Sequence, residues 1–141
     1  MRSSTHFTIA LHVLTLLASH PGEALTSDFI AGSVNTNPVF IRRVLAALRR
    51  SRLVTSQTGP GGGWLLTHAA RDVTLRDVFR ATEEGALFAL HSSTPNPKCP
   101  VGGNIQDILG RRFEATQRAV ERELEQTTIA DLVKEVQARS S

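Results

Sequence analysis

The chain has 141 residues, of which 40% are hydrophobic and 5% aromatic, so it is long enough for one domain with a buried core. Its formal charge of +3 is unevenly placed, since residues 1–80 hold nine arginines and four acidic residues while residues 81–141 hold seven basic and nine acidic ones. The first part is therefore the candidate binder of a polyanion. The scarcity of aromatic residues argues against a stacking platform for single-stranded nucleic acid.

The start of the chain has one feature of a signal peptide, because Met1 and Arg2 precede an apolar stretch. Polar residues recur in that stretch at helical spacing, whereas the core of a signal peptide is uniformly apolar. No apolar run approaches the length of a membrane span. A single cysteine excludes an internal disulfide framework and fits a reducing compartment. We therefore expect a soluble, cytoplasmic protein with no membrane contact.

Hydrophobic periodicity and capping residues predict six helices and one β-hairpin. The helices are expected near residues 5–19, 27–32, 38–51, 73–82, 104–126 and just after Thr128, and the hairpin strands at 53–56 and 64–67. Residues 32–35 should form the turn between the second and third helices. Thr26, Thr74 and Thr128 are the expected N-caps. The predicted fold class is mostly α with a small β-hairpin wing.

The helix predicted from Pro38 has two contrasting faces. At about 100° per residue its buried stripe comprises Phe40, Ile41, Val44, Leu45 and Leu48, and the opposite face carries Val39, Arg42, Arg43, Ala46, Arg49 and Arg50. No acidic residue occurs between Asp28 and Asp72. Asn37 is the expected cap, and Pro38 takes the first helical position, where proline is tolerated. A helix N-terminus favours phosphate, and the first turn of a recognition helix reaches base edges.

A glycine-rich stretch, residues 59–63, follows this helix and is typical of the tip of a β-hairpin. A basic helix followed by such a hairpin is the arrangement of a winged helix-turn-helix that binds DNA. The predicted DNA contacts are Thr36, Asn37, Pro38, Val39, Arg42, Arg43, Arg49, Thr58, Gly59, Gly61 and Gly62. The alternative is that the arginines form only a solvated basic surface.

The helix predicted over residues 104–126 keeps an apolar stripe, formed by Ile105, Ile108, Leu109, Phe113, Val120 and Leu124. A single winged domain has nowhere to bury it, so we expect a homodimer that presents two recognition helices to a palindromic operator. Packing within the subunit is the alternative. The expected organisation is a winged helix-turn-helix plus a long C-terminal dimerisation helix. The DNA-binding domain should span residues 1–82, and a loop carrying Cys99 should span 83–103. The dimerisation helix and a terminal short helix should span 104–141.

The chain resembles the Rrf-type family of bacterial winged helix-turn-helix transcriptional regulators over nearly its whole length. The resemblance rests on residues 37–48, 53–56, 59–66, 73–78 and 128–132, of which the glycine-rich wing is the most specific. It implies a homodimeric transcription factor, usually a repressor, whose wing enters the minor groove and whose long helix forms the dimer. Members of the family often sense redox state, nitric oxide, iron-sulfur status or thiol metabolism.

Two positions depart from the pattern of that family. Many relatives carry an arginine before the wing glycines, suited to a narrow minor groove, where this chain has Thr58. Cluster-binding relatives place three cysteines before the long helix, whereas this chain has Cys99 alone and His91 near the place of the first. A cluster needs about four protein ligands, mostly thiolates. The resemblance therefore places the chain in a single-cysteine, cluster-free branch, and we expect no cofactor and no metal.

Cys99 is the candidate sensor. It follows Lys98 and precedes Pro100, which is expected to open a helix, so an ammonium and a helix N-terminus would stabilise its thiolate. The alternative is an inert cysteine packed in a loop. A zinc site that joined Cys99 to His91 would need ligands from a partner subunit. The identity of the effector is not predicted.

No enzymatic motif is present. The wing glycines lack the dinucleotide spacing, no Gly-Lys-Ser/Thr follows them, and no histidine pair has metal spacing on a helix. We therefore expect a sequence-specific regulator that binds double-stranded DNA, a homodimeric repressor responsive to redox or thiol state, and not an enzyme. The rival hypothesis is a winged-helix protein-interaction module whose arginines face an acidic partner.

Overall fold

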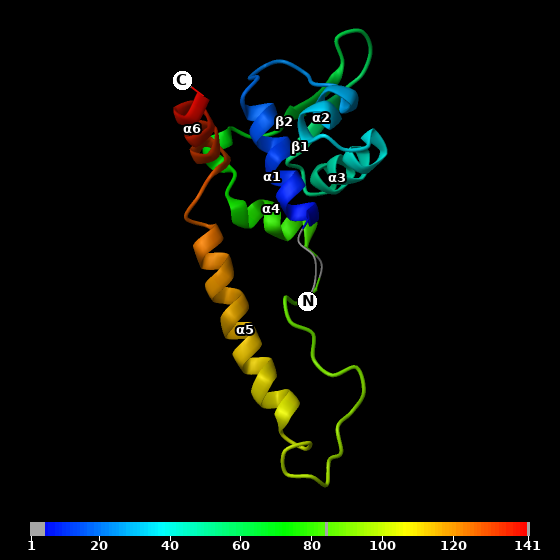
Figure 1. Ribbon diagram of the computed structural model, residues 1–141, viewed down its shortest axis with the longest axis vertical. Coiled ribbons are helices and arrows are strands. Elements are labelled where there is room, and N and C mark those ends of the chain that lie inside the picture. The colour runs from blue at the N-terminus through cyan, green and yellow to red at the C-terminus, as the bar shows by residue number, and fades with distance from the viewer. Residues whose placement is uncertain (1–4, 84, 141) are drawn as a thin grey trace.

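The computed structural model describes residues 5–83 and 85–140 (Figure 1). Within these residues the elements are α1 (Thr5–Ala18), α2 (Ser27–Val34), α3 (Pro38–Arg50), β1 (Val54–Gln57), β2 (Gly63–Leu66), the 3-10 helix η1 (Ala70–Asp72), α4 (Leu75–Thr82), α5 (Ile105–Leu124) and α6 (Ile129–Ser140). The predicted class, mostly α with a β-hairpin wing, is confirmed. No described helix is long and apolar enough to cross a membrane.

Helices α1, α2, α3 and α4 share one hydrophobic core with the base of the hairpin. Helix α1 runs through the middle of this body, with α6 on one side and α2 and α3 on the other (Figure 1). The largest fully buried side chains are Leu14, Ile30, Ile41, Leu45, Leu48 and Ile129. Since Ile129 belongs to α6, the last helix packs on the same core as the first four.

The buried face of α3 is close to the predicted one. Its side chains with no exposed surface are Ile41, Val44, Leu45 and Leu48. Phe40 is only half-buried, and its ring meets that of His6 edge-on at 4.9 Å. The Oδ1 atom of Asn37 accepts a hydrogen bond from the Val39 N–H at 2.8 Å, so the predicted cap is confirmed.

The turn between α2 and α3 is shorter than predicted. The sequence pattern predicts that Gly32 begins it, but α2 continues through Val34. A helical glycine costs about 1 kcal/mol relative to alanine and does not by itself end a helix. Asn35 ends it instead, because this residue adopts the left-handed conformation, with φ 61° and ψ 52°. Thr26 caps the start of α2 as expected.

The wing strands are antiparallel, with Val54 opposite Leu66 and Gln57 opposite Gly63. Each strand is offset by one residue from its predicted range. Leu25 adds a one-residue bridge to the open edge, since its backbone exchanges hydrogen bonds of 3.1 and 2.7 Å with that of Trp64. The hairpin is thereby tied to the segment that leads into α2.

The starts of α4 and α6 are fastened to each other. Helix α4 begins two residues later than predicted, because Thr74 is its N-cap and exchanges hydrogen bonds with Asp77. Thr128 and Asp131 form the same reciprocal pair at the start of α6. Backbone hydrogen bonds of 2.9 Å from Leu75 N to Thr127 O and from Ile129 N to Val73 O join the two caps.

Helix α5 extends away from this body, and the segment after α4 runs out to its far end (Figure 1). None of its 20 residues is buried in the single chain. Phe113, in the predicted stripe, meets the Phe88 ring at 5.3 Å, so the preceding loop covers part of that stripe. Pro100 does not open the helix as expected, because residues 100–104 form turns and α5 begins at Ile105.

Candidate nucleic-acid interface

The start of α3 presents its backbone and side chains to solvent. Asn37, Val39, Arg42 and Arg43 are exposed, and Val39 keeps 52% of its surface accessible. The N-terminal amides of a helix carry a partial positive charge that favours phosphate. The first two turns of α3 therefore offer an apolar side chain, two guanidinium groups and a positive helix end to one ligand.

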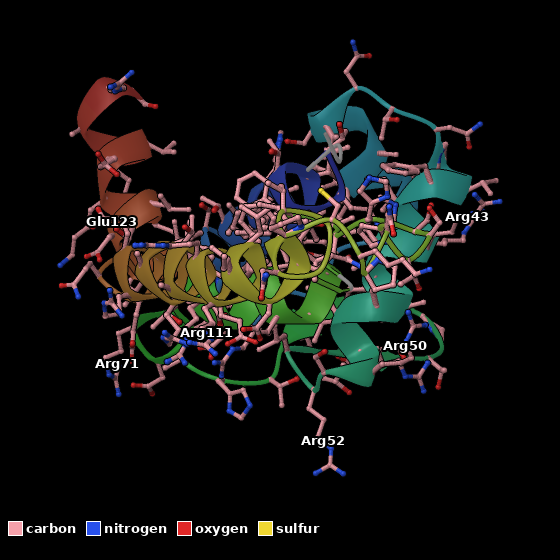
Figure 2. The ribbon with its side chains drawn as sticks, turned by 90° about the horizontal axis from the view of Figure 1, so that it is seen from below. Arg43, Arg50, Arg52, Arg71, Arg111 and Glu123 are labelled. Atoms are coloured by element: carbon pink, nitrogen blue, oxygen red, sulfur yellow. The ribbon has the colours of Figure 1, made fainter. Side chains whose placement is uncertain are left out.

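The arginines of α3 are free to bind an external partner. Within residues 5–83 and 85–140, no hydrogen bond or salt bridge occupies the guanidinium groups of Arg42, Arg43, Arg49 or Arg50. Figure 2 shows Arg43 and Arg50 pointing outward from α3. Cations without an internal partner can neutralise phosphates and release counterions when DNA binds.

The arginines of α4 have a different role. Arg80 Nε lies 2.6 Å from Glu121 Oε1, and Arg76 contacts Glu121 at 3.4 Å and Glu125 at 3.1 Å. The hydrogen bond from Arg80 is the largest cause that lowers the pKa of Glu121 below its ordinary value. These pairs join α4 to α5, so these two arginines are occupied in holding the long helix.

The wing carries no charged residue between Arg52 and His68. Its tip is a tight turn in which Gly62 N–H donates to Gly59 O at 2.9 Å, and Gly59 and Gly61 have positive φ angles. A side chain on Gly62 would meet the carbonyl oxygen of Gln57. The tip can therefore offer amides and the hydroxyl of Thr58 to a phosphate, but it adds no cation.

The fold brings the predicted contact residues to one side of the molecule. The wing and α3 both lie across α1 from α6 (Figure 1). Thr36 and Pro38 are half-buried beside the exposed first turn, while Arg49 lies in the last turn of α3. Cys99 is apart from this group, in the loop before α5.

Two arginines extend the basic surface beyond the predicted contacts. Arg50 and Arg52 are exposed, and Figure 2 shows Arg52 pointing away from the body beyond the end of α3. Arg52 has φ 61°, a conformation that turns the chain from α3 into the wing. The sequence signal that could have identified these arginines as part of the basic surface is the absence of acidic residues between Asp28 and Asp72.

Cys99 is a free cysteine, partly exposed in a compact loop. Hydrogen bonds from the backbone N–H of Gly102, and then of Val101, lower the pKa of its thiol below the ordinary value. The groups that lower the pKa are loop amides, and not the ammonium of Lys98 or the start of a helix as expected. A Cβ atom on Gly103 would lie 2.9 Å from Pro97 O, so the close approach of the loop depends on glycine.

Helix α3 is basic on its exposed face, and it lies beside a hairpin that is attached to the segment leading into α2. This arrangement defines a winged helix-turn-helix DNA-binding protein. Comparisons with known proteins agree. Residues 3–135 match the model of the Rrf2 family, described as an iron-dependent transcriptional regulator. The chain belongs to the Rrf2 family, and it is a DNA-binding transcriptional regulator. The predicted family is therefore confirmed. The rival hypothesis of a protein-interaction module is not supported.

Among its relatives is a Bacillus subtilis protein named as the HTH-type transcriptional regulator YwnA, 40% identical over 92% of this chain and 96% of that protein. A crystal structure of a protein described as DNA-binding has 36% identity and a TM-score of 0.74, covering 91% of this chain and 98% of that one. A transcriptional regulator structure from Lactobacillus plantarum has 26% identity and a TM-score of 0.82, covering 96% and 91%.

The iron named in the family description does not fit the residues of this chain. The described residues contain no group of three or more His, Cys, Asp or Glu side chains that could hold a metal ion. The whole chain has one cysteine, whereas an iron-sulfur cluster takes about four protein ligands, mostly thiolates. A single subunit therefore lacks the ligands for a cluster.

Proposed function

We propose that this regulator is a homodimeric repressor that binds a palindromic operator in double-stranded DNA through α3 and the wing. The proposed contacts are Thr36, Asn37, Pro38, Val39, Arg42, Arg43, Arg49 and the wing residues Thr58, Gly59, Gly61 and Gly62. The proposal places the protein with the DNA in the cytoplasm and includes no catalytic step.

The observation that carries this proposal is the row of unoccupied guanidinium groups on the exposed face of α3. Arg42, Arg43 and Arg49 have no partner among the described residues, whereas Arg76 and Arg80 are engaged by carboxylates. A helix face that carries several cations without internal partners is suited to an external polyanion.

Support for the dimer comes from α5. A helix of 20 residues is about 30 Å long, and it holds no buried residue in the single chain. Ile108 remains 51% exposed, and Phe88 and Leu90 from the preceding loop are 42% and 44% exposed. Pairing two copies along this face would bury the apolar groups and place two α3 helices on one duplex. Residues 104–126 are thus the proposed dimerisation segment, while α6 packs back on the core.

The experiment that tests the proposal is selection of duplexes from a random pool, followed by affinity measurements on the enriched duplex. Arg42→Ala with Arg43→Ala should weaken binding by about 1–3 kcal/mol for each base contact that is lost. The control is Lys134→Ala with Arg139→Ala on α6, which removes the same charge from exposed positions away from both α3 and the proposed dimerisation segment. Equal affinities for both double variants would contradict the assignment of α3.

The regulation of the proposed repressor is assigned to Cys99. The backbone N–H groups of Gly102 and Val101 lower the pKa of its thiol, and a thiolate reacts with oxidants faster than a thiol does. The loop leads directly into α5, so a change at Cys99 can reach the dimer and the spacing of the two α3 helices.

A further inference from the structure

Val39 is unusual among the apolar residues of α3. Every residue of this helix is described, and Val39 is its single large apolar side chain in the exposed class, at 52%. Its neighbours Phe40 and Ile41 turn inward, Phe40 against His6 and Ile41 into the core. Val39 therefore contributes nothing to the core, and its methyl groups lie at the end of α3 that faces the proposed DNA.

Val39, Arg42 and Arg43 form one surface patch, because residues three and four apart on a helix are neighbours. The helix itself carries no carboxylate, and Glu83 lines a pocket with Arg43 and Arg50 and not with Val39 or Arg42. The amide of Asn37 is engaged as the helix cap, since its oxygen accepts a hydrogen bond from the Val39 N–H at 2.8 Å. That cap fixes the amide toward the helix end and away from a bidentate position.

These side chains match particular base edges in the major groove. An arginine pairs with the O6 and N7 atoms of guanine, and an apolar side chain contacts the C5-methyl group of thymine. Reading of cytosine N4 uses a carboxylate, and bidentate reading of adenine uses an Asn or Gln amide. Val39, Arg42 and Arg43 supply neither of these groups. The chemistry of the patch itself therefore favours guanine and thymine.

We propose that Val39 reads the C5-methyl group of a thymine in each operator half-site, beside a guanine that Arg42 reads. This inference rests on the proposed function, in which α3 enters the major groove, and adds which bases the helix selects. Specificity of this kind comes from apolar contact as well as from charge, so it persists at salt concentrations that weaken phosphate contacts.

The test compares thymine with deoxyuridine, which differs from it only by the missing methyl group. After selection of an operator, each thymine is replaced in turn, symmetrically in both half-sites. At one position the wild-type protein should bind about fourfold more weakly for each methyl contact removed. Val39→Ala should bind the thymine operator more weakly than the wild type and bind the thymine and deoxyuridine duplexes equally.

Val136→Ala is the matched control, because Val136 is also a helical valine, 51% exposed, and lies on α6 away from α3. It should keep the wild-type preference for thymine. In a parallel experiment each guanine is replaced in turn by 7-deazaguanine, which lacks N7. At one position the wild-type protein should lose affinity, whereas Arg42→Ala should bind the guanine and 7-deazaguanine duplexes equally. Circular dichroism of each variant checks that the helices are retained.

The outcomes separate the inference from the function on which it rests. If no duplex is enriched, the proposed function fails and the inference fails with it. If an operator is found but no deoxyuridine substitution changes affinity, the function stands and the reading by Val39 is wrong. The same conclusion follows if Val39→Ala retains the full wild-type preference for thymine.

Discussion

The backbone of Gly63 passes so close to Leu25 that a Cβ atom on Gly63 would lie 2.5 Å from the Leu25 carbonyl oxygen. The contact is maintained by the hydrogen bond from Trp64 N–H to Leu25 O, 2.7 Å long. Gly63 also has a positive φ of 150°. The attachment of the wing to the helical body therefore requires glycine at this position.

Gly63→Ala should destabilise the protein by about 2–3 kcal/mol, because the added methyl group meets backbone that cannot move independently. Thermal or urea unfolding measures the change. Gly32→Ala is the control, since a Cβ there meets nothing within 4 Å and α2 is helical at that point. Gly32→Ala should be neutral or slightly stabilising. Equal stabilities for the two variants would show that the wing is not tied to Leu25.

Arg49→Ala should weaken binding to all duplexes alike. Arg49 lies in the last turn of α3, far from the first turn that is proposed to reach bases. Loss of one phosphate contact should reduce the slope of log affinity against log salt by about 1. Thr58→Ala is the matched control, because the wing carries no charge and the slope should be unchanged. A loss confined to the selected operator would instead assign Arg49 to base reading.

Acid should weaken the junction between α4 and α5. The pKa of Glu121 is lowered in the folded protein by its hydrogen bond from Arg80, so the folded state favours the ionised carboxylate. Its contribution to stability is present above the ordinary pKa of 4.5 and is lost as the pH falls through the lowered folded value. Glu121→Gln should cost about 1 kcal/mol or less at neutral pH, since the pairs are partly exposed.

The measurement for Glu121 is the free energy of unfolding of wild type and Glu121→Gln between neutral pH and about pH 3. The two curves should converge at the acid end. Glu114→Gln on the same helix removes an exposed carboxylate without a partner among the described residues, and its curve should run parallel to that of the wild type. A constant difference for Glu121→Gln across the range would contradict the role of its charge.

Phe113→Glu should prevent the proposed dimer. The substitution would place a charge on the apolar face of α5, where Phe113 packs against Phe88, and burying an unpaired charge is strongly unfavourable. Sedimentation should give a wild-type dimer at micromolar concentration and a monomeric variant. Glu114→Gln serves again as the control and should remain dimeric. A monomeric wild type would show that α5 does not join two copies.

Cys99 should be alkylated faster at neutral pH than the same thiol in the unfolded chain, because its lowered pKa leaves more thiolate. The rate against pH gives the folded pKa directly. Oxidation should change operator affinity in the wild type, and Cys99→Ser should bind the operator normally without responding. If both proteins respond equally to oxidant, the signal passes through another group.

Local features of this protein were predictable from its sequence. The caps of α2, α3, α4 and α6 follow from Thr26, Asn37, Thr74 and Thr128, since capping depends on a side chain and backbone amides only two or three residues away. The buried stripe of α3 and the glycine-tipped hairpin follow likewise from spacing along the chain. The fold class and the candidate DNA-binding face were accessible on these grounds, and the family was accessible from the resemblance of its motif residues.

The features decided by the tertiary structure depend on contacts between distant segments. No local pattern identifies Leu25 as the partner of Trp64, or Glu121 as the partner of Arg80. The helix expected at Pro100 is replaced by turns, and the thiol of Cys99 is stabilised by amides two and three residues further along. Sequence periodicity reports which face of a helix is apolar, but three-dimensional packing decides what covers it: the core for Ile129, and only part of a loop for Phe113.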